Sequence, residues 1–190
     1  MTIGFPTTIL AAMSLFLVAC MAGNEAPGPS LVLPEGTHPV GSGLPISAPN
    51  VPLSFGAITV CLDRPGNVTV YSVRPKDPTG GLTVTDFALR PNPAWHHHNM
   101  LGDQVGTLSD AWFHGVRRVT LVCEAKTGRS SELGLQVTKT GQGNGTSRSF
   151  IIRWHSRDRS GSLTVPFALV LCAGPTADTP ACAVGPLMPG

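Results

Sequence analysis

Alternating hydrophobic and polar residues dominate the chain from residue 51 to about residue 175. The runs are rich in Val, Ile, Thr, Phe and Leu, and turn residues bound them, which is the pattern of short β-strands with one buried face. No stretch shows a sustained apolar period of 3.6 residues, so we expect almost no helix. The expected strands cover residues 53–60, 68–73, 82–89, 116–125, 133–138, 150–154 and 163–171.

Seven short strands within about 125 residues predict an all-β fold, a two-sheet β-sandwich of immunoglobulin-like architecture. Only the architecture is predicted, because the Cys…Trp…Cys signature of true immunoglobulin domains is not convincing here. Pro166 interrupts the last expected strand, and since proline cannot donate to a ladder, we expect an edge or a bulge there. The Gly-rich residues 140–146 contain Asn144-Gly145 and favour a hairpin connection.

The segment from residue 20 to residue 50 has a different composition. It is rich in proline and glycine, contains no aromatic residue, and carries only Glu25 and Glu35 as charges. Such a segment buries too little apolar area to offset its chain entropy, and its prolines favour an extended course. We therefore predict a disordered linker over residues 20–50, followed by the β-sandwich domain over residues 51–190.

The first 19 residues have the pattern of an export signal. Residues 9–19 are apolar except for Ser14, a run that has the length of a signal-peptide core and is too short to span a bilayer. It ends at Leu17-Val18-Ala19-Cys20, which resembles the lipobox of bacterial lipoproteins. The resemblance implies that the Cys20 thiol receives a diacylglycerol and that a lipoprotein signal peptidase then removes residues 1–19. Two acyl chains on one residue anchor a protein stably in a membrane.

Two other interpretations of the leader remain open, an uncleaved anchor over residues 3–22 and an ordinary signal peptide cleaved after Ala19 or Ala22. All three place the remaining chain outside the cytoplasm. On the lipoprotein interpretation, the protein lies at the outer face of the cell membrane and is attached through the lipid on Cys20. Its Lys-poor composition, rich in Gly, Pro, Arg and Val, resembles that of actinobacterial surface lipoproteins of unknown function.

Four further cysteines follow the leader, namely Cys61, Cys123, Cys172 and Cys182. An even number of cysteines in an exported domain predicts two disulfides. We favour the local pairing, Cys172 with Cys182 and Cys61 with Cys123, because only a short segment separates the last two cysteines. A competing arrangement pairs Cys61 with Cys172, because the first and last strands of many sandwiches run side by side.

Composition and motifs exclude several classes of function. A net charge of +2 is too small to indicate a nucleic-acid-binding protein. The chain has no nucleophile elbow, no His-Glu-x-x-His and no phosphate-binding loop, so we expect neither an enzyme nor a cofactor. We expect a lipid-anchored binding or structural domain whose partner is an envelope protein or an anionic cell-wall polymer.

Arginines cluster around the sixth expected strand. Arg148, Arg153, Arg157 and Arg159 are opposed only by Asp158, and Arg117-Arg118 add to them. From residue 51 onward 13 basic residues stand against 9 acidic ones, and this excess would attract anionic headgroups or an acidic polymer. The alternative is that these charges protect an edge strand from pairing with other chains.

Three consecutive histidines, from His96 to His98, lie in the long gap between the third and fourth expected strands, and Met100 follows them. Imidazoles bind copper and zinc, and a thioether favours Cu(I). Because His96 and His98 share one side of an extended segment, these two residues and Met100 are candidate ligands. A good site needs a third ligand from elsewhere, such as His114 or His155. The alternative is an exposed polar loop that binds metal adventitiously.

Overall fold

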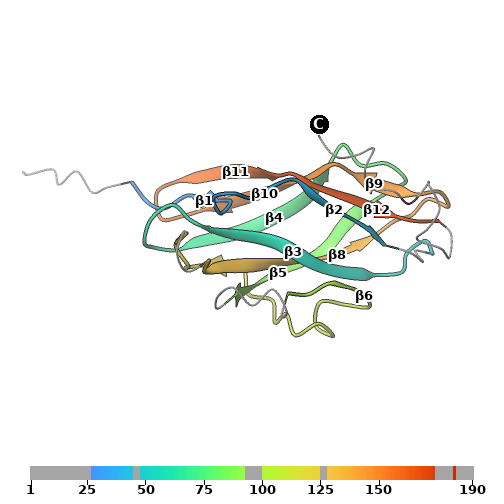
Figure 1. The fold of residues 1–190 in the computed structure, drawn as a ribbon, viewed down its shortest axis with the longest axis horizontal. Helices are drawn as coiled ribbons and strands as arrows, with labels where there is room; N and C mark the ends of the chain where they lie inside the picture. The colour runs from blue at the N-terminus through green and yellow to red at the C-terminus, as the bar shows by residue number, and fades with distance from the viewer. Residues whose placement is uncertain (1–26, 45–47, 93–99, 125–127, 174–181, 183–190) are drawn as a thin grey trace, which may run out of the picture.

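The computed structural model describes residues 27–44, 48–92, 100–124, 128–173 and Cys182. Within these ranges the chain forms twelve strands and no α-helix (Figure 1). No helix in the described ranges is long and apolar enough to cross a membrane. The all-β class expected from the alternating pattern is therefore confirmed.

The strands form three sheets, as Figure 1 shows. The five-stranded sheet has the order β1 (Leu31–Val32), β3 (Leu53–Leu62), β8 (Ser130–Thr138) and β5 (Thr83–Asn92), with β6 (Asp103–Val105) also on β3. The four-stranded sheet has the order β11 (Ser160–Val165), β10 (Ser149–His155), β4 (Val68–Lys76) and β7 (Arg118–Val119). The three-stranded sheet has the order β2 (Val40–Leu44), β12 (Phe167–Leu171) and β9 (Gly145–Ser147).

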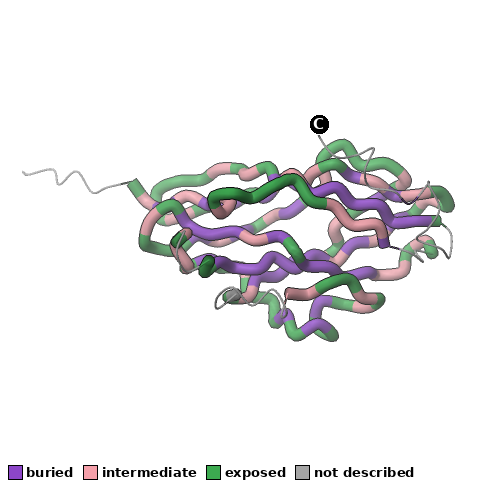
Figure 2. The backbone as a smooth tube through the Cα atoms, viewed as in Figure 1, coloured by how far each residue is buried: buried purple, intermediate pink, exposed green. Residues whose placement is uncertain are grey.

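One hydrophobic core joins the three sheets in a sandwich-like arrangement. Phe55 of β3, Phe150 of β10 and Phe167 of β12 come from different sheets, and each is at most 2% exposed. The ring centroids of Phe55 and Phe167 lie 5.2 Å apart, and those of Phe55 and Phe150 lie 6.0 Å apart. Figure 2 shows buried positions concentrated along the strands and exposed positions at the turns. The apolar side chains of the three sheets therefore meet in one main core, as the fold class requires.

Five of the seven expected strands are confirmed as β3, β4, β5, β8 and β10. The seventh is divided at Pro166 into β11 and β12, which belong to different sheets. Pro166 has no amide hydrogen to donate, and the chain changes sheets there, from pairing with β10 to pairing with β2 and β9. The Pro166 carbonyl still accepts a hydrogen bond from the Val40 amide at 3.4 Å. The fourth is reduced to the two residues of β7, after which Leu62 and Val122 form an isolated bridge.

The expected hairpin at residues 140–146 is wrong, because β9 pairs with β12 and not with β8. The connection therefore passes from one sheet to another. Gly141 donates its amide to the Gly80 carbonyl at 3.0 Å, which ties this connection to the turn before β5. The Asn-Gly pair thus lies in a crossover and not in a two-residue hairpin turn.

The disordered linker expected over residues 20–50 is wrong for residues 27–44. Two strands lie there, β1 antiparallel to β3 and β2 parallel to β12. Leu31 is 3% exposed and Leu44 is 1% exposed, so each strand contributes an apolar side chain to the core. The folded unit therefore begins before residue 51. Residues 20–26 and 45–47 of the expected linker, and the expected leader, lie outside the described residues.

Candidate functional site

The expected disulfide pairing is confirmed. Cys61 of β3 is bonded to Cys123, with their Cα atoms 5.1 Å apart, and Cys172 after β12 is bonded to Cys182, with their Cα atoms 5.5 Å apart. The competing pairing of Cys61 with Cys172 is wrong because its premise fails. The strand that runs parallel beside β12 is β2, which the sequence pattern had not revealed, and not β3.

The candidate metal ligands are only partly described. His96 and His98 lie outside the described residues, as does Cys20. Met100 is half-buried, whereas His114 is exposed in the segment before β7 and His155 is exposed at the end of β10. Across the described part of the chain, no three His, Cys, Asp or Glu residues come together as a metal-binding group. The metal hypothesis stays a prediction, without support from a described cluster.

The long gap after β5 is folded against the five-stranded sheet from residue 100 onward. Leu108, Ala111 and Phe113 are buried with Ala88 in a small separate core. Asp110 accepts hydrogen bonds from the amide and hydroxyl of Thr107 at 2.9 and 2.7 Å, and these bonds lower the pKa of its carboxyl. This turn is therefore held by its own side-chain hydrogen bonds and by the apolar residues packed beneath it.

A buried ion pair holds the beginning of this loop. The Glu132 carboxylate on β8 is almost fully buried and accepts a hydrogen bond from the Arg90 Nε at 2.7 Å. Its other oxygen accepts one from the Leu101 amide at 2.7 Å. The Arg90 guanidinium also lies over the Phe113 ring, 4.6 Å from its centroid. Glu132 therefore joins β5, β8 and the loop, and it acts as a structural residue.

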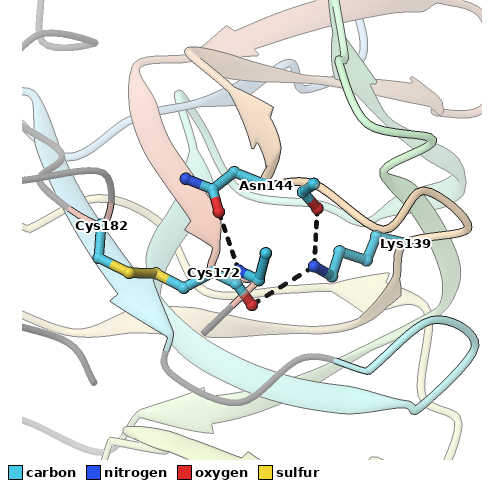
Figure 3. Close-up of a disulfide and its surroundings, with 6 residues drawn as sticks. Lys139, Asn144, Cys172 and Cys182 are labelled. Carbon is cyan, nitrogen blue, oxygen red and sulfur yellow. Dashed lines mark hydrogen bonds between the residues drawn. A yellow bond between two sulfur atoms is a disulfide. The ribbon is translucent and has the colours of Figure 1, made fainter. Parts of the chain in front are cut away.

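A second buried charge lies at the opposite end of β8 (Figure 3). Lys139 is 0% exposed, and its Nζ donates hydrogen bonds to the carbonyls of Gly143 at 2.7 Å and Cys172 at 3.4 Å. Asn144 accepts a hydrogen bond from the Ala173 amide at 2.8 Å. Lys139 and Asn144 thus fasten the crossover to the end of β12 beside the second disulfide. Burial lowers the pKa of the Lys139 ammonium.

The lowered pKa of Lys139 predicts how stability depends on pH. Its pKa in the folded state lies below the usual 10.5, so between these two values the unfolded chain binds more protons than the folded one. The free energy of unfolding should therefore gain a contribution that rises with pH in this interval. Urea unfolding from about pH 8 to about pH 10.5 should show that the wild type gains stability relative to Lys139→Met. Parallel curves for the two proteins would contradict the prediction.

Basic side chains gather on the outer face of the four-stranded sheet. Arg74 and Lys76 lie on β4, Arg118 lies on β7 and Arg153 lies on β10, and all four are exposed. On β10, Arg153 alternates with the buried Ile152 and Trp154, which directs it away from the core. The four strands of this sheet contain no Asp or Glu. We call these four residues the cationic face.

Polar and aromatic side chains accompany the cationic face. Ser162 is the register partner of Arg153, and Ser160 is that of His155. The rings of Tyr71 and His155 lie 5.8 Å apart between centroids, at an interplanar angle of 32°, and Tyr71 is 51% exposed. The face thus offers cations, hydroxyl groups and one exposed aromatic pair, which are the groups that bind anions and sugars.

The arginine cluster expected from the sequence is divided in the structure. Arg153 and Arg118 lie on the cationic face, and Arg148 is exposed immediately before β10. Arg117 forms an ion pair with Asp86 at 2.8 Å and lies over the Phe87 ring. Arg159 donates to the Gly28 carbonyl at 3.3 Å. Arginines that are close in the sequence therefore differ in their contacts. Some bind other parts of the chain, and the others are exposed to a ligand.

Arg74 and Lys76 were not singled out from the sequence. Their spacing of two residues was the available signal, because it places both on one face of a strand. Glu132 and Lys139 had no such signal, since a charged residue at the end of an apolar run is usually exposed.

No family model matches the chain, and neither the curated proteins nor the solved structures include a significant match.

Proposed function

We propose that the chain is an exported lipoprotein, anchored through Cys20 at the outer face of the cell membrane, whose immunoglobulin-like β-sandwich is a non-catalytic binding domain. The observation that carries the export part of this proposal is the pair of disulfides, Cys61–Cys123 and Cys172–Cys182. Disulfides form and persist in oxidising compartments outside the cytoplasm. They agree with the lipobox-like Leu17-Val18-Ala19-Cys20.

The binding role is supported by the cationic face. Among the described residues, Arg74, Lys76, Arg118 and Arg153 have no ion-pair partner. Unpaired cations gathered on one face attract anions, and a sheet surface without a catalytic motif suits adhesion better than chemistry. The partner class that fits is an anionic polymer of the envelope, and an envelope protein with an acidic surface is the other candidate.

Metabolic labelling tests the anchor. Cells that produce the full chain are grown with a palmitate analogue, and the wild-type protein should carry the label while Cys20→Ala should not. Cys182→Ala is the matched control, because it removes a cysteine elsewhere and should leave the label unchanged. An unlabelled wild type, or equal labelling of Cys20→Ala, would remove the lipoprotein proposal, and unlabelled protein in the medium would indicate ordinary secretion.

A further inference from the structure

The arginine on β10 does not protect a sheet edge. β10 pairs with β11 along residues 150–155 and with β4 along residues 149–155, so its backbone groups are occupied on both sides. A charge that discourages strand addition belongs on an edge strand. Arg153 lies in the interior of the sheet, so edge protection does not explain its charge. Arg118, in contrast, lies on the edge strand β7, and beyond Thr69 the strand β4 has a ladder partner only in β10 within the described part of the chain.

Three cations of the face, Arg74, Lys76 and Arg153, lie close enough to act together. Arg74 and Lys76 are two residues apart on one strand, which is about 7 Å. Arg153 lies on the neighbouring strand, two residues from Ile151, the register partner of Arg74. Thr69 of β4 pairs with both Arg118 and His155. Since adjacent strands are about 5 Å apart, the separations of Arg74 from Lys76 and from Arg153 are comparable to the Debye length of about 8 Å at physiological ionic strength, and the potentials of these three cations add. Arg118 lies opposite Thr69, five residues before Arg74 and therefore roughly 17 Å along the strand, so it extends the face without adding to that shared potential.

A hollow continues the cationic face at one end. Its volume is about 400 Å³, and it is lined by Lys76, Asp77, Thr79, Thr146, Arg148 and Ser149. Ser149 is the register partner of Lys76, so the hollow begins where the face ends. Arg148, in the lining, adds a fifth cation to those of the face, and Asp77 adds a carboxylate. An extended ligand that crosses the sheet would pass from the exposed face into this hollow.

The geometry points to an anionic polysaccharide as the occupant of the cationic face. Arginine and lysine would bind its acidic groups, the serine and threonine hydroxyls would hydrogen-bond its sugars, and the exposed Tyr71 ring would pack against a sugar face. A bilayer fits less well, because the exposed side chains of these strands are charged or hydroxyl-bearing apart from His155. The large aliphatic side chain on this face, Ile151, is half-buried beside Arg74 and Thr164, so little apolar surface is available to enter the acyl region. This inference rests on the proposed export, which places the domain beside envelope polymers.

Binding of the full chain, purified in a neutral detergent, to polygalacturonate tests the inference. Wild-type protein should bind at low salt, should lose affinity steeply as salt rises, and should not bind neutral dextran. The double variant Arg74→Gln with Arg153→Gln should bind roughly 25-fold more weakly, about fivefold for each lost cation. Arg64→Gln with Arg129→Gln is the control for net charge, because it removes two positive charges outside the face, one from the half-buried Arg64 beside Asp63 and one from the exposed Arg129, and it should bind like the wild type.

Each other outcome overturns the inference. Equal weakening by the two double variants would mean that net charge and not this face attracts the polymer. Absence of binding to polygalacturonate at low salt would exclude the polysaccharide, and binding only to vesicles that contain an anionic phospholipid would identify the face as a membrane contact. Palmitate labelling of Cys20 is independent of these measurements, so failure of the polymer binding leaves the proposed anchor standing, and failure of the anchor leaves the binding result intact.

Discussion

Replacing Cys61 and Cys123 with alanine should lower the free energy of unfolding by about 4 kcal/mol. The bond closes a loop with a sequence separation of 62 residues, and the entropy that a cross-link removes from the unfolded chain grows with the length of the loop. Cys61 is fully buried in β3, so the same bond also holds the segment after β7 against the five-stranded sheet. Urea unfolding of the purified protein measures the change.

The second disulfide is the control for this experiment. Cys172 and Cys182 are separated by only 10 residues, so removal of both should lower the free energy of unfolding by about 3 kcal/mol. Both variants lose two cysteines, and the difference between them isolates the effect of loop length. If the shorter loop proves the more stabilising one, the chain-entropy explanation fails for this protein, and the local contacts around Lys139 become the better explanation.

The alternation of hydrophobic and polar residues predicted the strands that have one buried and one exposed face. In β4, Val68, Val70 and Val73 are buried while Tyr71 and Arg74 are exposed, and this contrast was visible in the residues themselves. β8 is buried along most of its length, and it was identified by its β-branched and leucine residues. Local composition therefore decided the fold class and most of the strand positions.

The strands β1 and β2 were missed because they are stabilised by partners that are distant in the sequence. β2 has the sequence Val-Gly-Ser-Gly-Leu, which has low strand propensity on its own. It is held by parallel pairing with β12, from Val40 opposite Phe167 to Leu44 opposite Leu171, across more than a hundred residues of sequence. The local composition of this segment favours a linker. Pairing with the edge of β12 outweighs that local preference and makes the segment a strand.

The candidate site could be predicted only in part for the same reason. The two-residue spacing places Arg74 and Lys76 on one face of a strand, and the sequence alone shows that much. Their place on the same sheet face as Arg153 and Arg118 depends on the order β11-β10-β4-β7, which no periodicity reveals. The pairing of the cysteines needed less information, because a short segment already brought Cys172 and Cys182 together.

Replacing Glu132 with alanine should lower the free energy of unfolding by about 3 kcal/mol. Removal of one partner of a buried ion pair leaves the other charge uncompensated, which costs about 3–5 kcal/mol. The lower end applies because the Arg90 side chain is still 29% exposed. The variant also removes the acceptor of the Leu101 amide, so hydrogen exchange at this amide should accelerate, which urea unfolding alone would not reveal.

A double-mutant cycle separates the ion pair from the packing of the two side chains. Arg90→Ala with Glu132→Ala should be less destabilised than the sum of the single variants, because neither charge is then left without its partner. The Phe113 ring beneath Arg90 loses a contact in both variants that lack the arginine, and the cycle cancels that shared loss. Strict additivity would show that the 2.7 Å contact contributes no coupling and that Glu132 stabilises the fold only through Leu101. A coupling with unchanged exchange at Leu101 would assign the stabilisation to the Arg90–Glu132 pair and not to the loop.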